Sequence, residues 1–392
     1  MDRVRHAVAC TRRLTRRPTD VGVFINRRGG VAHDSPTTTR SPRAARGGRV
    51  GRVVDVIAVD PLSEDAEQRQ LFSDWLDVET TSQRDVFGPD HSAWSADEVR
   101  GRRRGSTHQF TDRAAVGEGG RVVGMLSVAE PLHDNHELAL VKLSVLPTAR
   151  RRGVGRLLLA EAESVVRAHG RALVQASTEG SRTGVDGPGD AFAASQGYEP
   201  AQTMLRSVMP LPADRHKLES YADGDGVEDA AAFAVEASWD GVPEAWLDDL
   251  AVLEQRMSTD APMGDLALEE EDWDAERVRS ELQWALDAGR RLVVVVARDL
   301  SVDRLVGFTQ VQVSQDSPEV AYQQDTLVLT EARGNGLGLR MKARAALELM
   351  DELPGVAGVR TWNADDNTHM LAVNADLGYE PGAYLREWQK RL

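Results

Sequence analysis

The chain has 392 residues, 41% of them hydrophobic and 28% charged, with a formal net charge of −15 at pH 7. This length suggests two to three domains with full hydrophobic cores, and the composition is typical of a soluble globular protein, for which we expect a cytoplasmic location. Apolar runs are too short for a membrane span, and the acidic balance argues against nucleic acid as a partner.

Residues 1–51 form an arginine-rich tail that we predict to be disordered. The first 52 residues hold thirteen Arg against three Asp, are rich in Gly, Ser, Thr and Pro, and lack a sustained apolar period. A nucleic-acid or membrane arm and a targeting peptide are alternatives, but a solvated tail, or translation of sequence upstream of the true start, fits better. Cys10, the only cysteine, falls in this tail, so we expect no metal site based on cysteine, and no metal.

Between residues 52 and 209 the pattern predicts strands and helices that lead into a glycine-rich turn. Strands are expected at residues 53–59, 109–116, 121–130, 137–146, 172–177 and 203–209, and helices at residues 63–78, 95–104, 153–169 and 190–196. Ser95 and Glu98 have the spacing of a capping box, and residues 117–120 are a hairpin signal. The turn is Arg150-Arg151-Arg152-Gly153-Val154-Gly155.

After a linker at residues 210–214, a similar order recurs over residues 215–392. Strands are expected at residues 217–221, 291–297, 305–313, 320–329 and 359–362, and helices at residues 227–237, 243–257, 269–288, 337–353 and 367–377. A second glycine-rich turn, Arg333-Gly334-Asn335-Gly336-Leu337-Gly338, opens the helix at residue 337.

The two halves repeat one unit. The distance from the first Arg of the turn to the Tyr of Gly-Tyr-Glu-Pro is 48 residues in the first half (Arg150 to Tyr198) and 46 in the second (Arg333 to Tyr379). A helix, a strand and a helix lie between them in each case. Two such signatures at nearly equal spacing indicate a duplicated mixed α/β domain.

Each turn follows a strand and opens a helix, so its backbone N–H groups and the positive end of the helix dipole point to one place, which suits a phosphate. Neither turn has the Gly-Lys-Ser/Thr of a nucleoside-triphosphate loop. Neither has the third spaced Gly, or the acidic residue about 20 positions on, of a dinucleotide site. Glycines that serve only the turn itself are the alternative.

The motif Arg-x-x-Gly-x-Gly, followed by a long helix, a strand, a short helix and Gly-Tyr, resembles the acyl-CoA-binding signature of the GCN5-related N-acetyltransferase (GNAT) superfamily. The resemblance covers residues 52–209 and 215–392. Through residues 257–266 and 361–367, Met370 and Asn374, the second half also resembles a bacterial tandem group that is similar to mycothiol synthase. The resemblance implies an α/β (α+β) fold of two tandem domains, each a mixed, mostly antiparallel twisted sheet flanked by helices.

The resemblance further implies an N-acetyltransferase that moves an acetyl group from acetyl-CoA to the primary amine of a small molecule. The turn amides would hold the CoA pyrophosphate, and the strand before each turn would lie beside the pantetheine arm. Asn363 and Asn367 match positions that in relatives often contact the cofactor, and capping a helix is an equally good interpretation of both. The implied cofactor-binding residues are Val145, Leu146, Arg150, Arg151, Arg152, Gly153, Val154 and Gly155 in the first half, and Leu327, Val328, Leu329, Arg333, Gly334, Asn335, Gly336, Leu337, Gly338, Asn363 and Asn367 in the second.

The acceptor amine must lose a proton before it attacks the thioester, so the reaction needs a base. Carboxylates on or beside the strand before each turn are candidates: Asp325 and Glu319 in the second half, and Glu137 in the first. We favour Asp325 because it lies four positions before Leu329, where family substrates approach. A solvent-facing strand residue is the commoner role for a single acidic residue.

Many relatives place a Tyr four residues before the Gly of the final Gly-Tyr, where it reprotonates the leaving thiolate. Ala193 and Asn374 hold those positions here, and Lys142 stands in the first half where Asp325 stands in the second. We therefore favour the C-terminal domain as the catalytic one, with the first as a scaffold or vestigial site. A non-catalytic acyl-CoA-binding or sensing protein and a protein lysine acetyltransferase are the alternatives.

Overall fold

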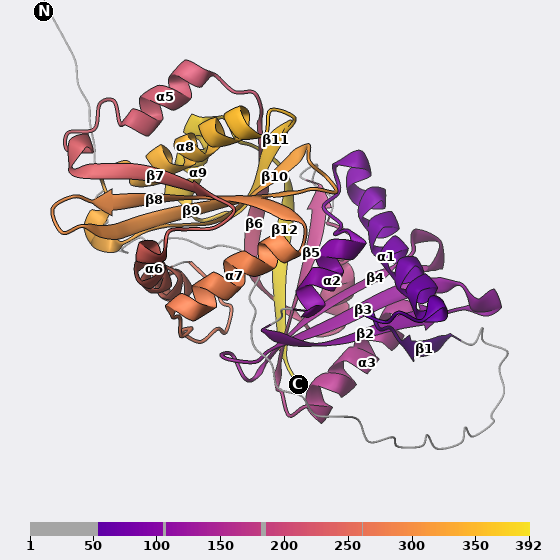
Figure 1. Cartoon of the computed structure of the whole chain (residues 1–392). Coiled ribbons are helices and arrows are strands. Elements are labelled where there is room, and N and C mark those ends of the chain that lie inside the picture. The colour runs from indigo at the N-terminus through magenta and orange to yellow at the C-terminus, as the bar shows by residue number, and fades with distance from the viewer. Residues whose placement is uncertain (1–53, 105–106, 182–185, 261) are drawn as a thin grey trace, which may run out of the picture.

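The computed structural model describes residues 54–392 except 105–106, 182–185 and 261. The tail predicted at residues 1–51, with Cys10, lies outside the described residues. The described residues form two α/β halves around one sheet, with the first half in indigo to magenta and the second in rose through orange to yellow (Figure 1).

A single twelve-stranded sheet runs through the described part of the chain. Only two neighbouring pairs, β4 with β5 and β10 with β11, are parallel, and the other pairs are antiparallel. This confirms the mixed, mostly antiparallel sheets flanked by helices that the resemblance implied. The strands are β1 (Asp55–Ala58), β2 (His108–Val116), β3 (Val122–Pro131), β4 (Leu138–Val145), β5 (Leu173–Ser181), β6 (Glu199–Pro210), β7 (Phe233–Trp239), β8 (Arg290–Asp299), β9 (Arg304–Ser314), β10 (Val320–Val328), β11 (Gly358–Ala364) and β12 (Glu380–Arg391).

The two halves exchange their last strands. The order across the sheet is β1-β2-β3-β4-β5-β12-β6-β11-β10-β9-β8-β7, so β12 of the second half pairs with β5 of the first, and β6 pairs with β11. In Figure 1 the yellow β12 accordingly lies between the magenta β5 and β6. The division at residues 210–214 stays a prediction, but the halves on either side of it share their central strands.

Helices cover both faces of this sheet (Figure 1). α1 and α2 pack on one face of the first half, and α3 packs on the other. In the second half, α6 and α7 lie on one face, and α5 and α8 lie on the other. The helices are α1 (Ala66–Phe87), α2 (Ala96–Arg104), α3 (Val154–Ala168), α4 (Asp190–Ser195), α5 (Arg215–Asp223), α6 (Leu247–Asp260), α7 (Ala275–Asp287), α8 (Leu337–Glu352) and α9 (Thr368–Leu377).

Alternation along the strands separates the core layers. In β8, Val293 and Val295 pack with α8, whereas Val294 and Val296 pack with α6 and α7. Successive strand side chains point to opposite faces, so an unbroken apolar run such as 292–297 marks a strand that is covered on both sides. Each of these side chains is at most 2% exposed, and full burial of one contributes about 1.5–3 kcal/mol.

Two predicted elements are wrong in type. Residues 217–221, predicted as a strand, lie in helix α5, which Asp214 caps by accepting from the Lys217 amide at 3.2 Å and which buries Leu218. Residues 227–237, predicted as a helix, include the start of β7, whose alternate residues Phe233, Val235 and Ala237 face the core beside α8. Packing against α8 outweighs local propensity in α5, and pairing with β8 outweighs it in β7.

Several predicted helix boundaries also differ from those in the structure. The first helix begins at Ala66, capped by Asp65, and runs to Phe87, well past the predicted end at residue 78. The acidic helix predicted from residue 269 begins only at Ala275, after the cap Asp274. The sequence pattern did not predict β12.

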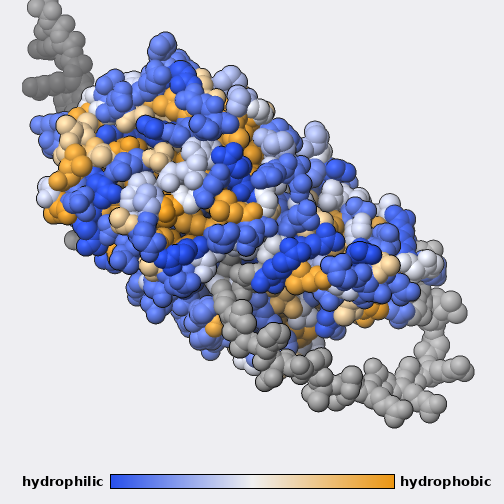
Figure 2. Space-filling view, in the orientation of Figure 1, coloured by the Kyte–Doolittle hydropathy of each residue, from blue (hydrophilic) through white to orange (hydrophobic). Residues whose placement is uncertain are grey.

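The face shown in Figure 2 is mostly hydrophilic, with groups of hydrophobic residues between the hydrophilic ones. In the described part of the chain, no helix combines the length and the apolar character that a membrane crossing requires.

Candidate acyl-transfer site

The two glycine-rich turns have the same backbone conformation. Arg151 and Gly334 occupy matching positions with φ of 62° and 89°, and Gly153 and Gly336 precede α3 and α8 with φ of 89° and 65°. No side-chain oxygen caps either helix, since the capping residue is glycine. The first-turn N–H groups of a helix lack intrahelical partners, so both turns present amides to an anion.

The first Arg of each turn holds the end of the preceding strand. Arg150 Nε donates to the Val145 carbonyl at 3.1 Å, and Arg333 Nε donates to the Val328 carbonyl at 3.1 Å. Each guanidinium also meets an aspartate: Arg150 pairs with Asp85 at 2.6 Å, and Arg333 lies 3.6 Å from Asp260. These arginines therefore fix the turn against the strand, besides any contact with a ligand.

The parallel strands beside each turn separate as they approach it. The ladder between β4 and β5 ends at Leu140 and Gln175, and the ladder between β10 and β11 ends at Tyr322 and Arg360. Beyond these pairs, the backbone groups of β4 that face β5 are outside any ladder. Apart from the Val145 carbonyl, which accepts from Ser82 at 3.2 Å and from Arg150 at 3.1 Å, these groups are free to pair with an extended ligand, as the family resemblance implies for a pantetheine arm.

One large cavity, of about 1520 Å³, opens at the first turn and passes through the separation between β4 and β5. Arg150, Arg151, Gly153 and Arg156 line its turn end. A cavity for a single drug-sized ligand measures about 300–1,000 Å³, so this one has room for two substrates. Residues of the second half, among them Tyr322, Trp362 and Glu387, complete its wall.

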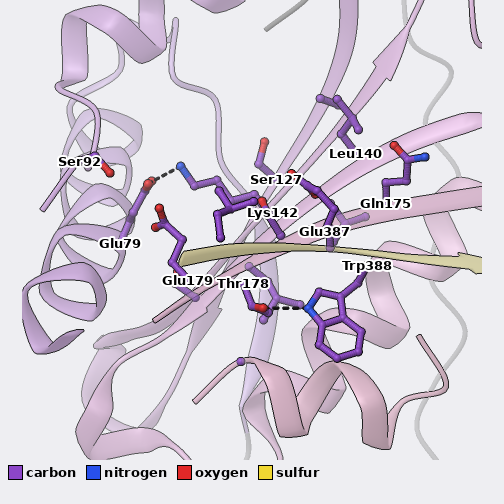
Figure 3. A pocket seen from close by; sticks show the side chains of 18 of the residues that line it. Glu79, Ser92, Ser127, Leu140, Lys142, Gln175, Thr178, Glu179, Glu387 and Trp388 are labelled. Carbon is purple, nitrogen blue, oxygen red and sulfur yellow. Dashed lines mark hydrogen bonds and ion pairs between the residues drawn. The ribbon is translucent and has the colours of Figure 1, made fainter. Parts of the chain in front are cut away.

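Carboxylates gather on the α1 side of this cavity, where Figure 3 shows them around one space. Glu79 of α1 forms an ion pair with Lys142 of β4. Glu179 of β5 accepts from Gln83 at 3.4 Å. Glu387 of β12 is paired through its backbone, and its side chain has no hydrogen bond or ion pair with another described residue. We call Glu79, Glu179 and Glu387 the carboxylate chamber.

The pKa values in the chamber reflect its low polarity. Burial raises the pKa of Glu387 to about 8, and the neighbouring Glu179 adds to the rise. Burial also raises the pKa of Glu179, against the opposing effect of Arg206 and Lys142. The Glu387 side chain keeps partial accessibility only because it faces the cavity. At neutral pH Glu387 therefore holds its proton for a large part of the time.

The second turn meets a smaller cavity, of about 850 Å³, with a different charge. Arg333 lines it together with four aspartates, namely Asp260, Asp265, Asp365 and Asp366. Three arginines line the turn end of the large cavity, so the first turn suits a polyanion far better than the second.

In the second half, three hydrogen-bonded polar side chains lie beside the separation between β10 and β11. Lys342 Nζ donates to Asn374 Oδ1 at 2.7 Å, and Asn374 Nδ2 donates to Asn363 Oδ1 at 2.6 Å. Burial lowers the pKa of Lys342 to about 7. In the first half, Leu159 and Ala193 hold the positions of Lys342 and Asn374, and both line the large cavity.

The predicted site residues are not all brought together. Asp325 lies where the register of β10 shifts between Gln323 and Thr326, and it lines neither cavity; Glu319 is exposed outside both. Asn367 caps α9 by accepting from the Met370 amide at 3.1 Å. Five of the predicted cofactor-binding residues line the large cavity: Val145, Arg150, Arg151, Gly153 and Gly155. Arg333 lines the small cavity. Four others are buried in the hydrophobic cores: Leu146, Val154, Leu327 and Leu337.

The sequence analysis did not predict the carboxylate chamber. Glu387 and Glu179 sit on neighbouring strands only because β12 crosses to the first half. Alternation within β12 puts Leu385, Glu387 and Gln389 on one face, and this was the one signal available.

The model of the Acetyltransferase (GNAT) family matches residues 70–183 and 259–379, once in each half. The chain belongs to this family. GNAT proteins bind an acyl-CoA and an acceptor substrate, so the chain is an acyltransferase by family. Both matched regions contain one of the two turns.

Similar GNAT proteins include tandem ones. The chain is 23% identical over 279 residues to a mycothiol acetyltransferase of Rothia mucilaginosa, covering 68% of this chain and 75% of that protein. A tandem GNAT protein from the clavulanic acid biosynthesis pathway, solved without AcCoA, has a TM-score of 0.69 and 26% identity, covering 86% of this chain and 98% of that one. A GCN5-related N-acetyltransferase of Sphaerobacter thermophilus shares the fold, with a TM-score of 0.58, 16% identity and coverage of 86% and 95%.

Proposed function

We propose that the protein transfers an acetyl group from acetyl-CoA to the primary amine of a small molecule, in the cytoplasm, and that the transfer takes place in the large cavity. One observation carries this proposal: a single cavity joins an arginine-rich turn, a strand separation and a carboxylate chamber. These are the three environments that a phosphate-bearing donor, its extended arm and a cationic acceptor need.

The donor would bind at the first turn. Its pyrophosphate would accept from the uncapped amides at the start of α3, while Arg151 and Arg156 supply positive charge at the rim. The pantetheine arm would pair with the free backbone groups of β4. The proposal thus assigns donor binding and transfer to the first half, whereas the sequence alone allowed a donor at either turn and favoured the second half for catalysis. The aspartates around Arg333 support this change.

The acceptor would bind on the α1 side of the sheet. Glu79, Glu179 and Glu387 approach the inner end of the strand separation from α1, β5 and β12. Once ionised, these carboxylates would attract an ammonium ion and hold it near the end of the donor arm, where a thioester would lie.

A non-catalytic acyl-CoA-binding protein is the second candidate. It is favoured by Ala193, which stands where many relatives have the Tyr that reprotonates the thiolate and which lines the cavity without a proton to donate. The two candidates share the donor site and differ only in turnover.

Calorimetry with acetyl-CoA, followed by a thiol-release assay on a panel of small amines, separates these candidates. Gly155→Glu and Gly338→Glu form a matched pair, because each places a carboxylate in the first turn of its helix, at a position where a Cβ meets nothing closer than 3.4 Å. We expect Gly155→Glu to abolish acetyl-CoA binding and Gly338→Glu to preserve it.

The reverse pattern would place the donor in the second half. Binding without turnover of any amine would support the sensing protein, and no binding by the unaltered chain would remove both candidates.

A further inference from the structure

Strand exchange brings the last strand of the chain to the strand separation of the first half. Glu387 pairs in register with Ser177 of β5, two residues beyond Gln175, where the ladder between β4 and β5 ends. Glu387 therefore lies beside the point at which the two parallel strands begin to separate. A donor arm that follows β4 inward would end at this point.

Glu387 faces the acceptor side of the sheet. Residues opposite each other in an antiparallel pair share a face, so Glu387 points to the same side as Ser177, and Glu179 follows two residues on. The next residue, Trp388, points to the other side and donates to Thr178 Oγ1 at 2.8 Å. Figure 3 shows Glu387 and Trp388 on opposite sides of the β12 ribbon.

The charged groups around Glu387 leave it unpaired. Lys142 of β4 is engaged by Glu79 of α1. Arg206 of β6 donates to the Asp90 backbone carbonyl at 2.5 Å and to its carboxylate at 3.1 Å. Glu179 of β5 is the like-charged neighbour that disfavours ionisation of Glu387.

We propose that Glu387 is the base that deprotonates the acceptor ammonium, and that Glu179 beside it binds the cation. The second half thus supplies the base for transfer at the first turn. This inference rests on the proposed function. The acceptor class that fits two adjacent carboxylates is a primary amine without an anionic group next to its nitrogen.

Glu387 takes one proton from the ammonium, and the neutral nitrogen forms a bond to the thioester carbonyl carbon. The carbon–sulfur bond then breaks, and sulfur leaves with the electron pair as a thiolate. The nitrogen loses a second proton, and the thiolate takes up a proton in its place. The products are the amide and free CoA.

The test uses full-length Glu387→Gln, with Glu380→Gln as the matched control at the exposed start of the same strand. We expect Glu387→Gln to bind acetyl-CoA normally in calorimetry and to lower kcat/KM for the best amine of the panel by about 10²–10⁴-fold. We expect kcat/KM of the unaltered protein to rise with pH through about pH 8 as Glu387 ionises, and we expect Glu387→Gln to lose this rise. Glu179→Gln should raise KM for the amine more than it lowers kcat.

A Glu387→Gln variant with an unchanged rate and pH profile would overturn the assignment while leaving the proposed function intact. If the unaltered chain turns over no amine, the proposed function fails instead. Infrared difference spectra between about pH 6 and about pH 10 then still decide whether Glu387 holds a titrating proton. A protonated-carboxyl band that is equal in the variant and the unaltered chain would overturn the inference.

Discussion

Arg150 and Val145 are joined by the same hydrogen bond that joins Arg333 and Val328 in the other half, with Nε 3.1 Å from the carbonyl oxygen in both. The bond ties each glycine-rich turn to the end of the strand before it. Any ligand on the turn amides would therefore be fixed relative to that strand. One donor could then bind the turn through its pyrophosphate and the strand through its pantetheine arm.

Arg150→Ala is expected to weaken acetyl-CoA binding about tenfold or more, because the turn loses its tie to β4 and a positive charge at the cavity. Both Arg150→Ala and Arg333→Ala should lose about 1–2 kcal/mol of stability, since each breaks a charged hydrogen bond. Calorimetry and denaturant unfolding measure the two effects. A fall in affinity with Arg333→Ala instead would contradict the assignment of the donor to the first turn.

Arg151→Gly is expected to separate stability from binding. Arg151 has a φ of 62°, which glycine adopts without strain, so the variant should be as stable as the parent or up to about 1 kcal/mol more stable. It should nevertheless bind acetyl-CoA several-fold more weakly, and with a smaller salt dependence, because one cavity-lining guanidinium is lost. A variant with unchanged affinity and salt dependence would show that Arg151 does not meet the donor.

Glu387→Gln is expected to stabilise the fold increasingly as pH rises. The folded-state pKa of Glu387, about 8, lies above the usual value of a glutamate, so the folded chain holds a proton that the unfolded chain releases, and stability falls as pH rises toward 8. Glutamine removes this dependence. The difference in Tm between variant and parent should grow from about pH 5 to about pH 8, and Glu380→Gln should show no such trend.

Lys342→Met is expected to show the opposite trend. Burial lowers the folded-state pKa of Lys342 to about 7, so the folded chain binds fewer protons than the unfolded chain above this pH, and stability rises with pH. The stability of the variant relative to the parent should therefore fall between about pH 7 and about pH 10, by at most about 1.4 kcal/mol per pH unit. Lys217→Met, at an exposed position, should show no such change.

Local features of the fold could be predicted because they are encoded by neighbours in the chain. The capping box is present, with the Ser95 amide donating to Glu98 at 2.8 Å and the Glu98 amide donating to Ser95 at 3.2 Å. Both glycine-rich turns open helices as expected, and Tyr198 and Tyr379 pack in the cores.

The partner of each last strand could not be predicted. Because the halves are duplicated, β5 and β11 offer similar edges for strand pairing. The alternating pattern of β12 fits against either strand, and no local sequence feature selects one of them. The choice depends on the whole sheet. For this reason the sequence points to Asp325, four positions before Leu329, and does not point to Glu387.

The place of β12 also orders events during synthesis. Domains generally fold from the N-terminus while the chain is still being made. In this protein the first half cannot complete its central sheet until residues 380–391 have left the ribosome, because β5 pairs with β12. A polypeptide that stops short of Glu387 would carry the entire first turn yet lack part of its chamber. If Glu387 acts as proposed, a chain that ends before β12 is complete would have no acyl transfer at the first turn.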